Sequence, residues 1–407
     1  MPSSGPVKAA DKSGLEGAGT GWQVVGGNRG AGSTSRAVHV DSPEQGNPKR
    51  ATPRNANWSA ERKIRVGLVG LGSAWEQRHR PSLRALADRF EVRAVCEQVR
   101  CRAEQAAAQL GAEVVDGFRN LIAREDVEAV LMLAPQWYGP LPIFAACQMR
   151  KPVYCAGGLE LDMEQAQKIT ERVRQAGIVF MAELARRHAP ATVRLKELIA
   201  TRLGAPRLLF CHLRSFWNPP APGDLNGLGS RCADAELVEL VDWCCYIVGQ
   251  APTYVMGLHH QAGGLERGQE DYVTICLDFS PPDRPGQGPA AQISYNRSIP
   301  AGWEEAMTYR PPAALQIHCQ QGIGFLDLPA TVVWFDEAGR HLESLEDERP
   351  VGERLLCQFY RLLLNPNNQT QDLEDVFRAI FILHQARRSH LLGQRIRLDW
   401  QQDQLRS

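Results

Sequence analysis

The chain has 407 residues, enough for about two domains of ordinary size. Its formal net charge is zero and charged residues make up 23% of it, so it lacks the basic excess of a nucleic-acid-binding surface. No apolar stretch approaches the ~20 residues that a membrane-spanning helix needs, and the first residues lack the apolar run of a signal peptide. We therefore expect no nucleic-acid partner and no membrane partner.

The cysteines give a second compositional constraint. Eleven are scattered along the chain, with no CxxC pair and no Cys/His spacing typical of a zinc site. Most lie inside apolar runs, as Cys96 and Cys276 do. An odd number of dispersed cysteines indicates reduced thiols, so we expect a cytoplasmic protein without a bound metal.

Residues 1–60 are rich in Gly, Ser, Pro and Asn and have almost no apolar periodicity. Such a segment cannot bury enough apolar surface to offset the entropy lost on ordering. It is expected to be a disordered tail, or else an arm that packs on a partner subunit.

From Lys63 to about residue 190, short apolar strands alternate with helices. The expected strands are residues 64–69, 91–96, 128–133, 153–155 and 178–181, and the expected helices are residues 81–89, 102–110, 141–149 and 163–175. This alternation predicts βαβ units, and so an α/β Rossmann domain over residues 63–190 whose parallel sheet is covered on both faces.

The pattern changes after Pro206, where longer strands are joined by loops rich in Gly and Pro. The expected strands are residues 207–214, 253–258, 272–279, 291–297, 315–318 and 331–335, with helices at 236–248 and 373–391. We expect residues 191–400 to form an α+β domain around a large, mostly antiparallel sheet. Its final segment is in a position to pack back on the Rossmann domain.

The first strand runs directly into the sequence GLGSAW, residues 70–75. The first glycine suits a tight turn, and the second leaves room for the backbone to approach a pyrophosphate at the start of a helix. Trp75 stands where a third small residue is usual, which disfavours close packing of helix and strand unless the loop is one residue longer. The loop residues expected to contact a dinucleotide are Gly70, Leu71, Gly72, Ser73 and Ala74.

Glu97, at the end of the second strand, is the expected partner of the adenosine ribose hydroxyls. Its charge would repel a 2′-phosphate, which favours NAD as the cofactor. Arg100 and Arg102 follow closely and keep NADP possible.

With these residues placed, the chain resembles the glucose–fructose oxidoreductase, inositol dehydrogenase and rhizopine-catabolism family (Gfo/Idh/MocA) over about residues 63 to 400. The match includes RVGLVGLGSAWEQRHRPSLRAL, with His79 shortly before Pro81, and AVLMLAPQWYG. The resemblance implies that Ala134 and Pro135 lie near the nicotinamide.

The family's catalytic lysine lies in a Glu-Lys-Pro triplet after a strand. The matching segment here is KPVYCAGGLELDMEQA, so the triplet becomes Ala156-Gly157-Gly158 and the lysine is absent. By the same resemblance, Ala156 and Gly157 are expected in the cofactor site. Arg187 and Pro190 match the family's arginine and proline before a long helix, and Arg187 is the last residue expected to contact the cofactor.

The family's second catalytic motif is Asp-x-Gly-x-His-x-x-Asp at the start of a helix. Its best match is AELVELVDWCCYIVG, which retains only Asp242 and has Glu239 in place of the histidine. Because one well-placed acid or base contributes ~10²–10⁴ in rate, losing both lysine and histidine puts activity in doubt. The substitutes we expect are Glu239, Asp242 and Tyr138. The alternative is that Glu236, Glu239 and Asp242 only form a polar helix face. Arg186 and Arg187 either hold an anionic substrate or cofactor phosphate, or are solvated.

Two functions remain open. One is an NAD(P)-dependent oxidoreductase that acts on a sugar, polyol or related hydroxy compound. The other is a non-catalytic cofactor-binding or ligand-binding sensor with the same fold. The alternation in residues 272–279 and 291–297, together with the way the family assembles, predicts that one sheet face is buried in a homo-oligomer.

Overall fold

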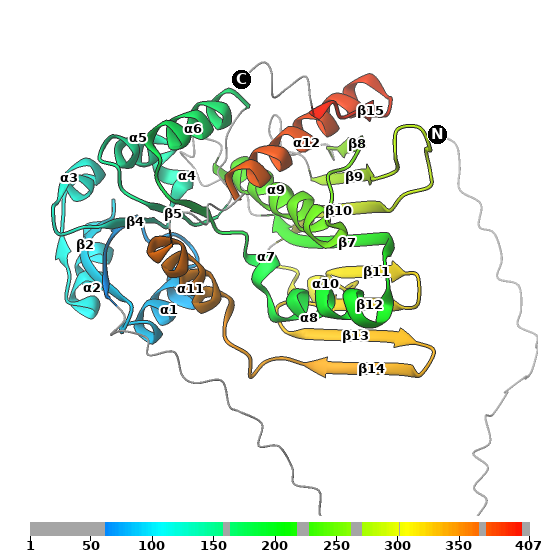
Figure 1. The fold of residues 1–407 in the computed structure, drawn as a ribbon, viewed down its shortest axis with the longest axis horizontal. Coiled ribbons are helices and arrows are strands. Elements are labelled where there is room, and N and C mark those ends of the chain that lie inside the picture. Colours follow the sequence, from blue (N-terminus) through cyan, green and yellow to red (C-terminus); the bar gives the residue numbers. More distant parts are fainter. Residues whose placement is uncertain are drawn as a thin grey trace, which may run out of the picture. The chain divides into compact units, whose positions relative to one another are not determined.

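The computed structural model of the chain describes residues 62–157, 163–217, 228–261, 271–300, 302–365 and 372–400, and the side chains of Trp217 and residues 228–233 are not described (Figure 1). The expected N-terminal tail, residues 1–60, and Gly158 lie outside the described residues. Residues 62 onward belong to one compact unit that contains both sheets. No helix among the described residues is long and apolar enough to span a membrane.

The first sheet has six parallel strands in the order β3-β2-β1-β4-β5-β6. They are β1 (Ile64–Val69), β2 (Phe90–Cys96), β3 (Glu113–Val114), β4 (Ala129–Met132), β5 (Val153–Cys155) and β6 (Phe180–Ala182). The chain runs outward from β1 to one edge and then crosses to β4 on its other side. In such sheets, ligands bind at this crossover, outside the carboxyl ends of the strands.

Helices cover both faces of this sheet, as the unbroken apolar strands predict (Figure 1). One face packs against α3 (Phe118–Ala123), α5 (Leu141–Gln148) and α6 (Met163–Ala176). The other packs against α1 (Arg80–Ala85), α2 (Arg100–Leu110) and α11 (Val351–Leu364), which comes from far along the chain. Phe359 of α11 is fully buried, and its ring lies 5.6 Å from that of Tyr154 in β5.

The second sheet has nine strands in the order β14-β13-β12-β11-β7-β10-β9-β8-β15, and only the β7–β10 pair is parallel. They are β7 (Pro206–Trp217), β8 (Tyr254–His260), β9 (Tyr272–Asp278), β10 (Ala290–Pro300), β11 (Leu315–Cys319), β12 (Ile323–Asp327), β13 (Thr331–Asp336), β14 (Gly339–Ser344) and β15 (Ile396–Arg397). The predicted fold class, an α/β Rossmann domain followed by a mostly antiparallel sheet, is therefore confirmed.

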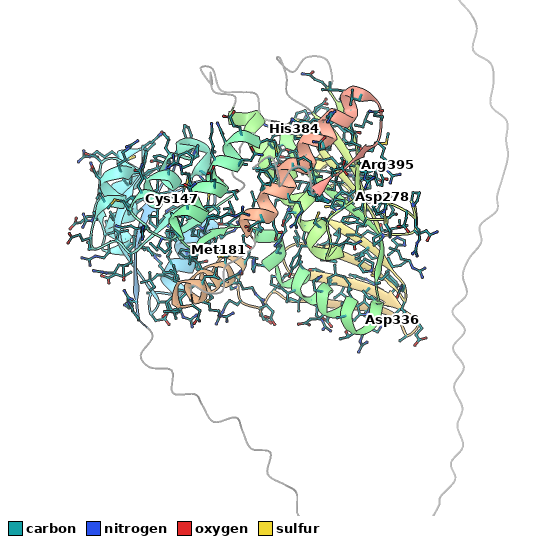
Figure 2. All side chains as sticks on the ribbon, turned by 45° about the horizontal axis from the view of Figure 1, so that its top comes forward. Cys147, Met181, Asp278, Asp336, His384 and Arg395 are labelled. Carbon is teal, nitrogen blue, oxygen red and sulfur yellow. The ribbon has the colours of Figure 1, made fainter. Side chains whose placement is uncertain are left out.

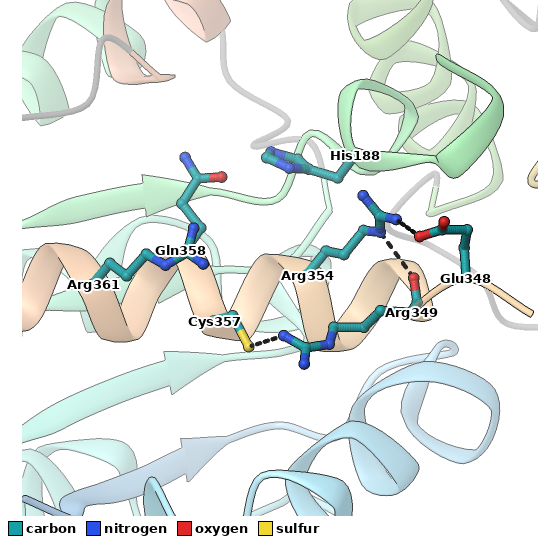
Figure 3. A pocket seen from close by; sticks show the side chains of 7 residues that line it. All are labelled: His188, Glu348, Arg349, Arg354, Cys357, Gln358 and Arg361. Atoms are coloured by element: carbon teal, nitrogen blue, oxygen red, sulfur yellow. Dashed lines mark hydrogen bonds and ion pairs between the residues drawn. The ribbon is translucent and has the colours of Figure 1, made fainter. Parts of the chain in front are cut away.

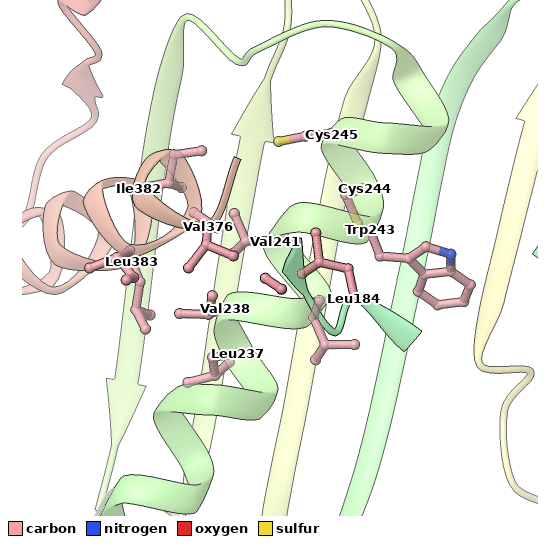
Figure 4. Packing of buried hydrophobic residues seen from close by; sticks show 14 of the residues in the cluster. Leu184, Leu237, Val238, Val241, Trp243, Cys244, Cys245, Val376, Ile382 and Leu383 are labelled. Atoms are coloured by element: carbon pink, nitrogen blue, oxygen red, sulfur yellow. The ribbon is translucent and has the colours of Figure 1, made fainter. Parts of the chain in front are cut away.

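One face of the second sheet is covered by α8 (Pro190–Leu198), α9 (Leu228–Val248) and α12 (Asp372–Leu392). Figure 4 shows Val238 and Val241 of α9 beside Val376 and Leu383 of α12, all of them buried. After α12 the chain returns to the sheet edge as β15. There Arg395 pairs with Asp278 and lies over the ring of Tyr254 (Figure 2).

Candidate functional site

The glycine loop after β1 presses against the end of β4. Gly70 and Gly72 have φ of 71° and 66°, in the region that favours glycine. A Cβ on Gly72 would lie 2.1 Å from the carbonyl oxygen of Leu133, and one on Gly70 would lie 2.4 Å from Cβ of Ala134. The backbone therefore requires glycine at both positions, as a dinucleotide-binding turn does.

Trp75 occupies the position of the third small residue without disrupting the turn. It begins a π-helical turn, η1 (Trp75–His79), and its side chain is buried in the cluster beneath α1. A π turn is wider than an α turn, so it accommodates a large side chain where a tighter helix start would need glycine or alanine. Ser73 is exposed beside Ala74 on the open side of the loop.

Glu97 ties the two strand ends together. Its carboxylate accepts a hydrogen bond from the N–H of Leu71, at 2.8 Å, and another from the N–H of Gln98, at 2.9 Å. Arg102 donates to the carbonyl oxygen of Gly72 at 3.3 Å, whereas Arg100 pairs with Glu104 on the helix surface. The loop therefore has one carboxylate and one guanidinium beside it.

The residues expected near the nicotinamide lie at the carboxyl ends of β4 and β5. Ala156 donates its N–H to the carbonyl oxygen of Met132 at 2.8 Å, which aligns the two strand ends. Gly157 has φ of 71°, and a Cβ there would come within 4.0 Å of Pro135. Ala134, Pro135, Ala156 and Gly157 therefore share one edge of the sheet with the glycine loop, and none of them carries a charge.

The second expected group, Glu239 and Asp242, lies on α9 and is held by α7 (Ala185–His188). Glu239 accepts the N–H of Arg186 at 3.0 Å, and its other oxygen lies 3.5 Å from Nε of the same residue. Asp242 is 2% exposed and is gripped by two nitrogens of Arg187, whose third nitrogen bonds to Asp375 at 2.8 Å. The structure thus places Arg187 in an internal ion-pair network.

Asp242 and Arg187 are both affected by their buried surroundings. Burial raises the pKa of Asp242 to about 6, although the guanidinium of Arg187 acts in the opposite direction. Arg187 also lies 5.0 Å from the ring centre of Tyr246, so its charge has an aromatic neighbour as well as two carboxylates.

The uncharged residues at the ends of β4 and β5 and the two acids of α9 approach each other where α4 (Pro135–Tyr138) contacts α9. Tyr138 lies at the glycine loop: its ring packs against Gly70, and its buried hydroxyl lies beside the thiol of Cys96. Burial, followed by the neighbouring Cys96, raises the pKa of this hydroxyl. Tyr138 therefore lines the glycine loop.

Sequence reasoning missed a buried polar cluster at the same edge. Glu183, 4% exposed, accepts hydrogen bonds from Arg78 of η1 and from the hydroxyl of Tyr154, at 2.8 Å for the latter. His79 lies 3.6 Å from Glu183, and burial lowers its pKa. Through Glu183, Arg78 joins η1 to the end of β6. The sequence feature that could have indicated this cluster is the position of Glu183 directly after the buried strand Phe180–Ala182.

The comparison with known families agrees with this geometry. Residues 64–184 match the model of the Gfo/Idh/MocA oxidoreductase family, described as having an NAD-binding Rossmann fold. Inositol 2-dehydrogenase of Mycolicibacterium smegmatis is 30% identical over 161 residues, which are 39% of this chain and 46% of that protein. A dTDP-3,4-didehydro-2,6-dideoxy-alpha-D-glucose 3-reductase of Actinomadura kijaniata is 29% identical over 175 residues, 43% of this chain and 50% of that protein. The matched segment spans about half the length of these relatives.

Solved structures extend the likeness in fold to both domains. Aldose-aldose oxidoreductase from Caulobacter crescentus, complexed with glycerol, superposes with a TM-score of 0.71 at 15% identity, covering 83% of this chain and 100% of that one. Levoglucosan dehydrogenase in complex with NADH and levoglucosan gives a TM-score of 0.70 at 16% identity, covering 83% and 99%. These comparisons confirm that residues 64–184 resemble the Gfo/Idh/MocA family of oxidoreductases, described as having an NAD-binding Rossmann fold, and the solved structures add a likeness in fold alone.

Proposed function

We propose that the chain is an NAD-dependent oxidoreductase that acts on a secondary hydroxyl of a sugar, a polyol or a related small hydroxy compound. The observation that carries this proposal is the glycine loop, whose two glycines leave no space for a Cβ against Leu133 and Ala134. Such a cradle fits a pyrophosphate, and it lies at the sheet edge that α9 approaches. The names of the relatives, inositol 2-dehydrogenase among them, support the substrate class.

The dinucleotide would be held by Gly70, Leu71, Gly72, Ser73 and Ala74 around the phosphates, by Glu97 at the adenosine ribose, and by Ala134, Pro135, Ala156 and Gly157 towards the nicotinamide. Glu97 favours NAD because its carboxylate lies beside the loop. Arg102 donates to the same loop and supplies the cation that a 2′-phosphate needs, so NADP is the second candidate.

A nicotinamide held at this edge of the sheet would supply the hydride acceptor that oxidation of an alcohol needs. The chain's own residues must then take the hydroxyl proton, and Glu239 occupies the position of the family's histidine. Its carboxylate is held towards α7 by the N–H of Arg186. Asp242, with a pKa raised to about 6, lies one helical turn further along α9 and would hold the proton next. Arg187 fixes Asp242 and thereby positions the pair.

The second candidate is a non-catalytic cofactor-binding or ligand-binding sensor. It is favoured by the absence of a lysine or histidine at the two family positions and by the ion pair that Arg187 makes with Asp242. Both candidates share the cofactor site, so NAD(H) binding alone does not separate them.

The test is a screen of sugars and polyols with NAD and NADP, using the full chain and the variants Glu239→Gln and Gly72→Asp. We expect NAD-dependent turnover by the wild type, a fall in kcat of about 100-fold or more in Glu239→Gln, and loss of NAD(H) binding in Gly72→Asp. Glu171→Gln, on the exposed side of α6, is the matched control and should leave kcat unchanged.

Turnover that is equal in wild type and Glu239→Gln would remove Glu239 from the mechanism. Intact NAD(H) binding with no turnover on any substrate would favour the sensor. Failure to bind either dinucleotide at millimolar concentration, in protein whose melting is cooperative, would show that the cofactor site is a relic.

We further propose that the chain forms a homo-oligomer through the uncovered face of the nine-stranded sheet. That face presents exposed apolar side chains on several strands: Leu208, Met256, Leu258, Phe335 and Leu342. Exposed apolar side chains gathered on one face of a sheet are typical of protein–protein interfaces.

A further inference from the structure

A separate cavity of about 540 Å³ lies between α7 and α11 (Figure 3). Its lining includes Arg354 and Arg361 of α11, with His188 of α7 on the facing side. Arg349, two residues before α11, also lines it, and its guanidinium lies beside the thiol of Cys357. None of its lining residues belongs to the glycine loop, to the ends of β4 and β5, or to α9. Its volume is that of a site for a small organic ligand.

Positive charge exceeds negative charge in this cavity. Three arginines line it against one glutamate, Glu348, whose carboxylate accepts a hydrogen bond from Arg354 at 2.7 Å. Glu353, which does not line the cavity, lies 3.8 Å from Arg349. The guanidinium of Arg361 makes no ion pair with any described residue. Arg354 and Arg349 each have a carboxylate neighbour, so Arg361 is the arginine whose charge is available to an anion.

The uncharged polar side chains of the cavity, Gln358 and His188, can also contact an anion. The amide of Gln358 lies one turn from both Arg354 and Arg361, and Figure 3 shows it on the side of α11 that faces His188. Burial, with the charges of Arg187 and Arg354, lowers the pKa of His188 to about 4. The neutral imidazole therefore offers one N–H donor without adding charge, and a nearby anion would favour its protonation.

We propose that this cavity binds the phosphate group of a small phosphomonoester, with Arg354 and Arg361 on the phosphate oxygens and Gln358 on a hydroxyl of the remaining molecule. Guanidinium groups match phosphate oxygens in pairs, which makes arginine the usual side chain for this purpose. The cavity is larger than inorganic phosphate needs, so an organic part fits beside the phosphate. The proposal does not depend on the proposed reaction.

The test is calorimetric titration of the full chain, without dinucleotide and at constant ionic strength, with glucose 6-phosphate, inorganic phosphate and glucose as probes. We expect saturable binding of glucose 6-phosphate that is at least tenfold weaker in Arg361→Gln and in Arg354→Gln. Arg84→Gln, an exposed arginine of α1 away from the cavity, is the matched control and should bind as the wild type does.

Tighter binding of glucose 6-phosphate than of inorganic phosphate would support the phosphomonoester, and equal binding would reassign the cavity to free phosphate. Arg354 also bonds to Glu348 and to the backbone of Arg349, so its variant can affect folding, whereas Arg361 is exposed and its variant is the decisive one. Absence of saturation by either phosphate up to about 10 mM, or equal weakening in Arg84→Gln and Arg361→Gln, would overturn the proposal.

Discussion

His188 illustrates how the environment of one side chain alters the pH dependence of the whole fold. Its imidazole lies close to two arginines, and burial with these charges lowers its pKa to about 4. In the unfolded chain the same group has a pKa near 6.5. Between these two values the unfolded chain binds one more proton than the folded chain, so the free energy of unfolding must fall as the pH is lowered through this window.

We predict that His188→Gln loses less stability than the wild type between pH 7 and pH 4. The difference should be on the order of 2 kcal/mol, because each unit of pKa shift corresponds to ~1.4 kcal/mol. Urea denaturation at several pH values measures it, with His384→Gln on the exposed side of α12 as the control. Parallel pH profiles for wild type and His188→Gln would contradict the prediction.

At the same scale, some local features of the candidate site could be predicted from the sequence and others could not. The glycine turn at Gly70 and Gly72 and the place of Glu97 at a strand end could be predicted because both are local features. The contacts of Glu183 with Arg78 and Tyr154 could not, because they join residues 29 to 105 positions apart through the packing of η1, β5 and β6. Likewise, nothing local to Arg187 indicates that Asp242 and Asp375 surround it.

Helix α11 is one of the elements that we did not expect from the sequence. Its sequence VGERLLCQFYRLLL has a clear apolar face at helical spacing, so the helix itself was predictable. Its partner was not, because α11 follows β14 in the chain yet packs on the parallel sheet of the first domain. Strands β12 and β14 were missed as well, whereas the central strands of both sheets were predicted from their buried or alternating residues.

We predict that Phe359→Ala lowers the free energy of unfolding by about 3–5 kcal/mol, because this ring is fully buried against Tyr154 and its removal leaves a cavity. Leu364→Ala on the same helix removes a side chain that is 45% exposed and should change stability by less than about 1 kcal/mol. Chemical denaturation followed by circular dichroism distinguishes the two. Equal losses would show that α11 is not anchored through Phe359.

At the scale of the whole described unit, the two faces of the nine-stranded sheet differ. One carries α8, α9 and α12, and the other exposes apolar side chains such as Met256 and Leu258, at 52% and 56% exposure. Because side chains alternate along each strand, the buried residues share the first face and the exposed apolar residues share the second. This asymmetry is the physical basis of the proposed homo-oligomer.

We predict that light scattering of the wild type at micromolar concentration gives a mass above that of one 45.1 kDa chain. The double variant Met256→Glu and Leu258→Glu should shift it towards the monomer, because charges placed within an apolar interface must be desolvated on association. Glu337→Gln, in the turn between β13 and β14, is a surface control. A monomeric wild type would contradict the prediction.

The four residues of α7 have a thermodynamic consequence. Arg186 contacts Glu239, Arg187 pairs with Asp242, and His188 lines the arginine-rich cavity. This short helix therefore contacts three separate groups of ionisable side chains. If an anion in that cavity displaces α7, it changes the proton affinity of Asp242. Linkage then requires that protonation of Asp242 changes the affinity for the anion by the same factor. The anion affinity would therefore vary with pH around 6, where Asp242 titrates, in addition to any variation that His188 itself causes.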